Sequence, residues 1–372
     1  MSNTVNKKLR VLIVNKYYDI VGGVEESVRQ LATINESDLE ITVLVQTVTK
    51  DVSHLIAQFP HIKLILLPIT FTALRMPVSL HFFRRYMKEL RKTDVLHIHS
   101  PFPLAEWFYI ILNWFTSYKC KLIMTWHTDV VNQKLFIRIH HWFLKRLFKI
   151  SSYIAVTSPA IISGTKVLQP FKEKVIVVPL GVYGLESKPD RSYDKFTFAL
   201  FAGRLIYYKG LSTLLDALTG TEMKLVIVGR GPLYKELRKK AKDLGIESQL
   251  TWRGQITDDE LKELYKSCSL LTFPSVAITE AFGLVQAEAM SYGLPIINTD
   301  LPTGVPWVAR NNIEAITVPV ENVEELHNAL VDIYKDSALR EQLGKNGRKR
   351  FEEMFTVDKW KSRYVELYRS LR

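Results

Sequence analysis

Several features that define other classes of protein are scarce or missing in this chain. Only two of its 372 residues are cysteines. Cys120 and Cys268 are far apart and neither belongs to a CxxC pair, which argues against a disulfide framework and against a structural zinc site. Long hydrophobic runs are also missing, because the most apolar stretch, residues 108–115, is far shorter than a bilayer span and contains Asn113.

The overall hydropathy points the same way. A mean hydropathy of +0.01 excludes a polytopic membrane protein. The polar residues 2–8 and the short apolar run 11–14 contain no signal-peptide h-region. We therefore expect a cytoplasmic protein.

Positive charge is present in excess, and it is unevenly distributed. The net charge is +12. Residues 1–185 hold 23 Lys and Arg against 12 Asp and Glu, whereas the remainder holds 27 against 26. This asymmetry predicts that the N-terminal half alone contacts an anionic partner, either a membrane or a nucleic acid.

The order of apolar runs predicts an α/β protein with two parallel sheets. Glycine turns and helical patterns separate most of the runs, as right-handed crossovers require. Residues 179–193 are turn-rich, so we place domains at 1–185 and 192–355, with a closing helix at 356–372. The expected strands are 9–15, 41–45, 62–67, 95–97, 122–126, 153–156, 175–178, 196–201, 225–228, 250–253, 270–273, 295–298 and 315–318.

Two glutamates stand eight residues apart in the second half of the chain. Pro274 ends a short buried strand and helical spacing resumes at Phe282, so Glu280 is expected in a loop and Glu288 on a helix. A loop carboxylate can accept hydrogen bonds from sugar hydroxyls, and the N–H groups of residues 282–285 can hold an anion. This combination suits a nucleotide sugar. The alternative is a helix-start acid followed by a solvated helix residue.

A loop with two cations follows the first strand of the second half. It runs from Gly203 to Gly210, carries Arg204 and Lys209, and precedes a helix expected from Leu211. Two cations beside a helix N-terminus can neutralise both phosphates of a diphosphate leaving group, as a metal ion otherwise would. The alternative of two surface cations is weakened by the glycines that bracket them.

Two other motifs resemble sites of different chemistry. Gly229-Arg230-Gly231-Pro232 lacks the third glycine of a dinucleotide fingerprint, so we interpret it as a turn that lines a nucleotide pocket rather than as an NAD site. The acidic run that ends at Glu260 could suggest a metal site. Its Thr257 and Glu260 instead have the spacing of a capping box.

In the first half, a glycine pair and a histidine are the candidate site residues. Gly22 and Gly23 follow the first strand and precede a helix at 24–34, where the backbone can approach a ligand; a plain tight turn is the alternative. His127 ends a strand at the edge where open α/β sheets bind ligands, although a structural histidine is the alternative. No carboxylate or cysteine cluster completes a metal site with His97 and His99.

Two expected helices, at 81–92 and 134–149, carry basic stripes at spacings of three and four. Aromatic residues border both stripes, which is typical of helices that lie on anionic lipid, whereas the alternative is a solvated charged face. The residues predicted to contact membrane are Arg84, Arg85, Lys88, Arg138, Trp142, Lys145 and Lys149.

Taken together, four motifs resemble those of the family 4 retaining glycosyltransferases. They are Gly22-Gly23, His127 in T-W-H-T-D, the G-R-L-x-x-x-K-G loop with Arg204 and Lys209, and the E-x7-E pair that begins at Glu280. The likeness covers essentially the whole chain. It implies a GT-B fold, in which two Rossmann-like domains face each other across a cleft and the last helix crosses back to the first domain. Longer runs, such as RLIYYKGLSTLL, are similar to bacterial rhamnosyl- and mannosyltransferases of O-antigen and related polysaccharide assembly.

The resemblance also implies roles for the matching residues. The amides of Gly22 and Gly23 would approach the donor diphosphate and the acceptor, and Glu288 would hold the ribose hydroxyls. Retention in this family is commonly attributed to front-face attack, in which the leaving phosphate oxygen takes the acceptor's proton. The remaining implied contacts are Arg204 and Lys209 on the phosphates, Glu280 with the amides of Phe282, Gly283 and Leu284 on the donor sugar, and His127 near the reacting carbon.

The sequence therefore predicts a retaining glycosyltransferase that needs no metal or other cofactor. We expect it to move a hexose, with mannose from GDP-mannose favoured, to a lipid-linked saccharide while its basic half docks on the cytoplasmic face of an anionic membrane. No nucleic-acid partner is expected, and the oligomeric state is left open. The alternatives are a nucleotide-sugar epimerase of the same fold and a non-catalytic protein that binds membrane or nucleic acid.

Overall fold

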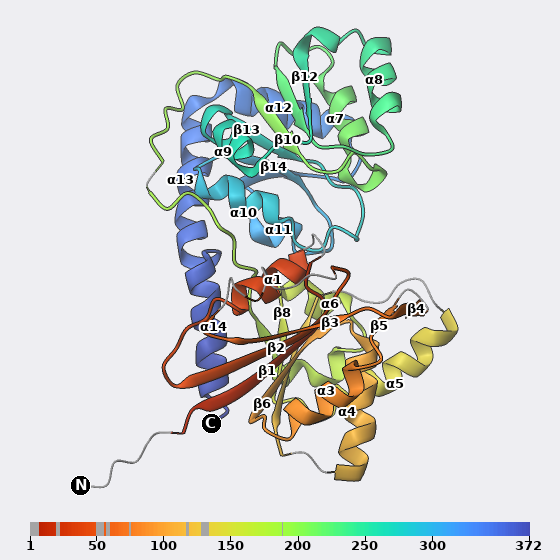
Figure 1. Cartoon of the computed structure of the whole chain (residues 1–372). Helices are drawn as coiled ribbons and strands as arrows, with labels where there is room; N and C mark the ends of the chain where they lie inside the picture. Colours follow the sequence, from red (N-terminus) through yellow and green to blue (C-terminus); the bar gives the residue numbers. More distant parts are fainter. Residues whose placement is uncertain are drawn as a thin grey trace, which may run out of the picture. The chain divides into compact units, whose positions relative to one another are not determined.

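The computed structural model describes residues 7–19, 23–49, 56, 60–73, 76–116, 119–127, 134–187 and 189–372, and for residues 23 and 134–139 the backbone alone. It divides into two compact units. The first comprises residues 1–157, 161–181 and 357–372, and the second comprises residues 158–160 and 182–356. Each unit is built around one parallel sheet with helices on both faces (Figure 1).

The sheet of the first unit has seven strands in the order β3-β2-β1-β6-β7-β8-β9, and all of its pairings are parallel. The chain first adds strands on one side of β1 and then on the other, so the order reverses between β1 and β6. A ligand crevice is expected at such a reversal, beyond the carboxyl ends of the strands. The strands are β1 (Leu9–Tyr17), β2 (Leu39–Thr47), β3 (Lys63–Pro68), β6 (Val95–Ser100), β7 (Lys121–Trp126), β8 (Tyr153–Val156) and β9 (Val175–Val177).

Helices cover both faces of this sheet because alternate strand residues point to opposite sides. Leu12 and Val14 of β1 pack in a core with α3 (Phe82–Leu90), α4 (Pro103–Thr116) and α5 (Lys134–Ile150). Val11 and Ile13 pack on the other face with α1 (Gly23–Leu31) and α14 (Val357–Arg369). The unit also contains residues 161–164 of α6 (Pro159–Gly164) and the hairpin β4 (Phe71–Ala73) and β5 (Met76–Val78).

The second unit has a six-stranded parallel sheet in the order β12-β11-β10-β13-β14-β15, which reverses between β10 and β13. Its strands are β10 (Ala199–Ala202), β11 (Leu225–Val228), β12 (Leu250–Gly254), β13 (Leu270–Phe273), β14 (Ile296–Thr299) and β15 (Ala315–Val318). Its helices are α7 (Leu211–Leu218), α8 (Tyr234–Asp243), α9 (Asp258–Ser267), α10 (Leu284–Ser291), α11 (Val305–Val308), α12 (Val323–Lys335) and α13 (Ser337–Met354).

All thirteen predicted strands are present, but one strand and one helix of the second unit begin later than predicted. The strand predicted at 196–201 begins only at Ala199, because Phe196 packs beside Tyr334, with ring centroids 5.1 Å apart, before the strand starts. The helix predicted from Phe282 begins at Leu284, because Gly283 takes a left-handed conformation (φ 78°) as its N-cap.

Arginine side chains hold the segment that enters the second unit. Arg191 donates from Nε to the carbonyl of Tyr292 at 2.9 Å and from its other nitrogens to the carbonyls of Tyr265 and Cys268, at the end of α9. Arg340 similarly bonds the carbonyl of Tyr193. The bonds of Arg191 satisfy carbonyls at the ends of α9 and α10.

Candidate functional site

The predicted phosphate loop and the predicted sugar-binding loop of the second unit lie side by side. One follows β10 and the other follows β13, and these are the strands between which the sheet order reverses. The loops are joined by a backbone hydrogen bond from the N–H of Val276 to the carbonyl of Tyr208 at 2.8 Å. Gly210 (φ 68°) passes so close that a Cβ there would lie 1.7 Å from the carbonyl oxygen of Pro274. Only glycine fits at this position.

Lys209 and Glu280 form an ion pair across these two loops. Lys209 Nζ contacts Glu280 Oε2, and the side chains are only 14% and 12% exposed. Ser275 Oγ donates to the same carboxylate oxygen at 3.1 Å. The pair therefore places a cation and an acceptor-only group together at the switch point of the sheet.

Arg204, the other predicted phosphate ligand, is exposed on the same loop. Its flanking glycine, Gly203, packs against the stem of Lys209, since a Cβ there would lie 3.6 Å from Lys209 Cε. The loop thus carries one cation that is paired with Glu280 and one that is exposed.

The turn after β11, which includes Gly229, lines a pocket. The pocket is formed by Gly229, Arg230, Gly231, Tyr234, Trp252, Arg253 and Gly254. Gly229 has φ 132°, and a Cβ there would lie 1.9 Å from the carbonyl oxygen of Gly203, so this turn also fixes the start of the cation loop. Aromatic and cationic side chains in one hollow suit a base and a phosphate.

The helix α10 carries the remaining predicted donor residues. Leu284 and Val285 are the first two residues of the helix. Their N–H groups therefore have no acceptor carbonyl within the helix and can donate to an anion. Phe282 is buried just before it. Glu288 accepts a hydrogen bond from Tyr265 Oη at 2.9 Å, and burial raises the pKa of its carboxyl.

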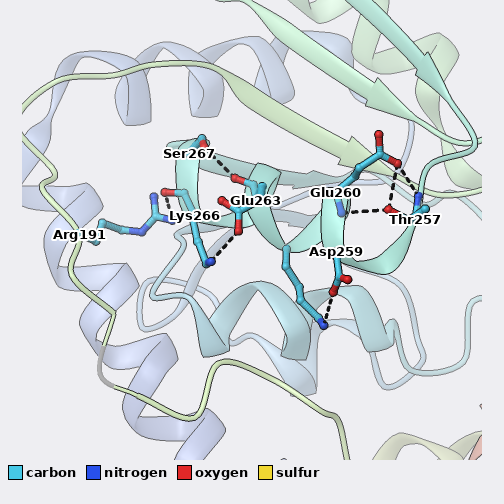
Figure 2. A network of polar contacts seen from close by, with 8 residues as sticks. Arg191, Thr257, Asp259, Glu260, Glu263, Lys266 and Ser267 are labelled. Atoms are coloured by element: carbon cyan, nitrogen blue, oxygen red, sulfur yellow. Dashed lines mark hydrogen bonds and ion pairs between the residues drawn. The ribbon is translucent and has the colours of Figure 1, made fainter.

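The acidic run before α9 is a helix cap, as predicted. Thr257 Oγ1 accepts from the N–H of Glu260 at 3.2 Å, and Glu260 Oε2 accepts from the N–H of Thr257 at 2.8 Å. Figure 2 shows this cap, with Asp259 and Glu263 turned toward lysines further along the helix. These carboxylates are thus engaged with the helix and its cations.

In the first unit, His127 lies at the carboxyl edge of the sheet, where it was predicted. It is 8% exposed. Its Nε2 lies 3.0 Å from Nδ1 of His99. His99 is the penultimate residue of β6 and lies two residues after His97. Burial lowers the pKa of His127 to about 4, so the ring is neutral at physiological pH.

The glycine pair is only partly described. Gly23 begins α1, whereas Gly22 lies outside the described residues. Asp19, two residues after β1, accepts hydrogen bonds on its carboxylate from the hydroxyls of Thr47 and Thr49 at 2.7 and 2.6 Å. Although burial alone would raise it, these bonds hold the pKa of Asp19 below its ordinary value. Sequence reasoning missed Asp19, because its partners come from a different strand.

His97 and His99 have the geometry of a packed core rather than of a metal site. His97 Nδ1 lies 2.8 Å from Tyr368 Oη, and its Nε2 lies 2.7 Å from Thr125 Oγ1. Both ring nitrogens of His97 are therefore occupied. Among the described residues, no group of three or more His, Cys, Asp or Glu side chains could hold a metal ion.

The predicted membrane residues fall into two different surroundings. On α3, Arg84 and Lys88 are exposed, but Arg85 is half-buried with its Nε 3.4 Å from Glu89. The aromatic residues of α3 that were expected to border the stripe, such as Phe82, pack in the core. On α5, Trp142, Lys145 and Lys149 are exposed, whereas the side chain of Arg138 lies outside the described part.

An exposed aromatic cluster joins Trp142 of α5, which the sequence singled out, to residues of α4 that it did not. Trp114 and Phe115 of α4 are 55% and 81% exposed, and Trp142 is 44% exposed. The rings of Trp114 and Trp142 meet edge to face at 6.0 Å. Arg146 lies over both, 4.1 Å from the Trp142 ring and 5.5 Å from the Trp114 ring. The sequence did contain a signal for this cluster, because the helix at residues 103–116 is apolar on all sides and must expose part of its apolar surface.

In the described part of the chain, no helix is long and apolar enough to span a bilayer.

Comparison with known proteins assigns this architecture to a family. The model of "Glycosyltransferase Family 4" matches residues 21–183, and that of "Glycosyl transferases group 1" matches residues 185–350. The "O-antigen chain mannosyltransferase C" of Escherichia coli is 28% identical, and the match covers 98% of this chain and 99% of that protein. The "D-rhamnosyltransferase WbpZ" of Pseudomonas aeruginosa is 29% identical over 75% of this chain and 74% of its own length.

A solved structure matches the fold over nearly the whole chain. Anabaena Alr3699/HepE, crystallised with UDP, has a TM-score of 0.76 and 18% identity, and the match covers 98% of this chain and 100% of that one. The two parallel sheets thus form a GT-B fold. The chain belongs to the family 4 glycosyltransferases and is a sugar-transferring enzyme. Neither the epimerase nor the non-catalytic alternative is supported.

Proposed function

We propose that this enzyme transfers mannose from GDP-mannose, with retention and without a metal ion, to a lipid-linked saccharide in polysaccharide assembly. The observation that carries the proposal is the Lys209–Glu280 ion pair at the switch point of the second sheet. The choice of mannose is supported by the E. coli relative named a mannosyltransferase, which this chain matches from end to end.

The ion pair suggests how the site prepares for its donor. Before the donor binds, Glu280 neutralises Lys209 in a poorly hydrated place, where an unpaired charge would be costly. A donor diphosphate replaces the carboxylate as the partner of Lys209, and Arg204 supplies the second positive charge. Glu280 is then released to accept hydrogen bonds from hydroxyls of the donor sugar.

The chemistry that follows is electrostatic. Lys209, Arg204 and the first N–H groups of α10 stabilise the negative charge that develops on the leaving phosphate, which is the role that a metal ion has in other transferases. The leaving oxygen takes the proton of the acceptor hydroxyl on the same face of the sugar. The carbon–oxygen bond to phosphate breaks, the bond to the acceptor forms, and the configuration is retained.

The rest of the donor is assigned to the neighbouring features. Glu288, held by Tyr265, accepts hydrogen bonds from the ribose hydroxyls. The base lies in the pocket formed by Gly229, Arg230 and Trp252. His127 contacts the sugar near the reacting carbon.

The acceptor is proposed to be presented at a membrane surface. Trp114, Phe115 and Trp142 form an exposed aromatic cluster, and Arg146 and Lys145 place positive charge beside it. Aromatic rings prefer the interfacial region of a bilayer, and cations are attracted to anionic headgroups. This surface supports the proposal of a peripheral position on the cytoplasmic face of the membrane.

The first test is a thermal-shift panel of GDP-, UDP-, dTDP- and ADP-linked sugars on the wild type and on Glu288→Ala. A ligand that binds the folded state alone raises Tm, so GDP-mannose should give the largest shift and Glu288→Ala should lose it. A transfer assay with EDTA then tests metal independence, and NMR of the product tests retention, which requires an α-mannoside. A UDP-sugar response, loss of activity with EDTA, or a β-linked product would each overturn the corresponding part.

A further inference from the structure

Three buried histidines are stacked at the carboxyl edge of the first sheet. His97 and His99 lie on one face of β6, and their ring centroids are 4.5 Å apart. The ring of His99 stacks in turn on that of His127, with centroids 5.3 Å apart and planes 21° from parallel. The three side chains are at most 8% exposed. His99 is therefore held between a structural ring and the ring assigned to the sugar site.

The contact between His99 and His127 joins two neutral imidazoles. Burial lowers the pKa of both rings below the ordinary value, and to about 4 for His127. Each ring then carries one proton, so one nitrogen of the pair donates and the other accepts. The 3.0 Å contact joins Nδ1 of His99 to Nε2 of His127, which leaves two arrangements.

The second nitrogen of His99 decides between them. Nε2 of His99 is buried and has no hydrogen-bond partner in the described part of the chain. If His127 were the donor, His99 would carry its proton on Nε2 and bury an unpaired N–H. If His99 is the donor, Nε2 is a bare acceptor. Orphaned buried N–H groups are rare in native proteins, and unsatisfied acceptors are better tolerated.

We propose that His99 is a positioning residue that donates from Nδ1 to Nε2 of His127 and so fixes His127 as the tautomer protonated at Nδ1. His127 then presents an N–H donor to the site and has no lone pair available there. It can hold a sugar or phosphate oxygen, but it cannot remove the acceptor's proton. The role of His127 toward a sugar rests on the proposed function, whereas the tautomer does not.

The surroundings also keep the ring of His99 from flipping. His97 is fixed on both sides, by Tyr368 Oη at 2.8 Å and by Thr125 Oγ1 at 2.7 Å, and Thr125 is held by Tyr364 Oη at 2.8 Å. This hydrogen-bonded chain joins α14 to β6 and β7 and packs a fixed ring against His99. A flip of His99 would bring Nε2 toward His127 only by moving a ring that neighbours on both sides confine.

The tautomer can be read directly from two-bond 1H–15N spectra of protein labelled with 15N-histidine, without any ligand. His127→Gln and His99→Gln assign the two rings among the nine histidines. In the wild type at pH 7.5, we expect His127 to be protonated at Nδ1 and His99 also at Nδ1. A His127 ring protonated at Nε2, or a charged one, would overturn the proposal. The wild-type spectrum decides the question even where a variant folds poorly.

Kinetics provide the second test. If His99 had only a structural role, a variant that keeps its N–H donor would not be more active than a variant that removes it. His99→Leu removes the donor and should lower kcat/KM by about tenfold or more, mainly through kcat. His99→Asn keeps a side-chain N–H near the position of Nδ1 and should restore most of the activity. A folded His99→Leu enzyme with wild-type kcat would contradict the positioning role. If the wild type transfers no sugar at all, the proposed function fails while the NMR result stands.

Discussion

Lys209 and Glu280 are 71 residues apart in the chain, yet they form an ion pair across the neighbouring loops that follow β10 and β13. Removing one member of a largely buried pair leaves an uncompensated charge, which is more costly than removing both. Because Lys209 is also the proposed partner of the donor diphosphate, Lys209→Ala should lower both donor affinity and kcat/KM by about 100-fold or more.

The pair can be dissected by comparing single and double variants. Lys209→Ala and Glu280→Ala should each destabilise the protein more than Lys239→Ala, whose partner Asp243 lies on an exposed face of α8. The double variant Lys209→Ala/Glu280→Ala should recover stability but not activity. Urea unfolding and the transfer assay measure the two effects, and unchanged activity in Lys209→Ala would remove the basis of the proposed site.

A second prediction concerns the glycine beside that lysine. Gly210 and Gly245 have nearly the same left-handed φ, 68° and 69°, but only Gly210 faces a neighbouring carbonyl. Gly245→Ala should cost about 1 kcal/mol, which is the left-handed strain alone. Gly210→Ala must also move the loop of Pro274 and should cost at least about 2 kcal/mol more and reduce donor binding. Equal unfolding free energies for the two variants would show that the loops are not locked together.

The buried histidines predict acid sensitivity of the first unit. Burial lowers the pKa of His97 to about 3 and that of His127 to about 4. Unfolded histidine binds a proton near pH 6.5, so the unfolded state holds more protons below that value and stability is lost as the pH falls from 6.5 toward 4. At pH 5 each ring should cost about 2 kcal/mol relative to pH 8. His127→Gln should reduce this loss, as urea unfolding at the two pH values would reveal.

Glu106 should have the opposite effect on how stability changes with pH. It is fully buried, its Oε1 accepts a hydrogen bond from Ser100 Oγ at 2.6 Å, and burial raises its pKa to about 7. The folded state then holds the extra proton between pH 4.5 and 7, so this group stabilises the protein at the acid end and loses its contribution as the pH rises through 7. Glu106→Gln should steepen the acid loss. A shallower loss would contradict the sign of this shift.

The aromatic cluster of α4 and α5 predicts binding to anionic vesicles. Trp114→Ser/Phe115→Ser should reduce partitioning onto phosphatidylglycerol vesicles by at least about tenfold, because each ring contributes on the order of 1.5 kcal/mol or more when buried. Tyr183→Ser provides a control in the second unit, where an aromatic side chain is 62% exposed. Sedimentation with vesicles at low and high salt measures both. Equal binding of both variants would show that this cluster does not face the membrane.

The sequence was informative where local chemistry decides the structure. Strands such as β13 were predicted to the residue, since a short apolar run ended by Pro274 leaves few alternatives. The capping box at Thr257 was likewise predictable, because both partners lie within one turn. The order of these apolar runs along the chain was also enough to predict that the strands form two parallel sheets.

What could not be predicted depends on contacts between distant segments. The stacking of His99 on His127 requires the register of β6 against β7, and the pairing of Lys209 with Glu280 requires the order of β10 and β13. The exposure of Phe115 depends on which side of an apolar helix the sheet covers. A single sequence specifies these relationships only through the complete fold.

The path of the chain has a consequence for how the protein is made. Residues 357–372 complete the first unit, where Trp360 and Tyr368 pack in its core, although the second unit is synthesised before them. On the ribosome the second unit, most of which is the continuous segment 182–356, can close first, while the first unit remains without one of its covering helices until residues 357–372 have emerged. The unit made first is thus finished last, and a nascent chain that stalls before α14 should be a preferred target for chaperones and proteases.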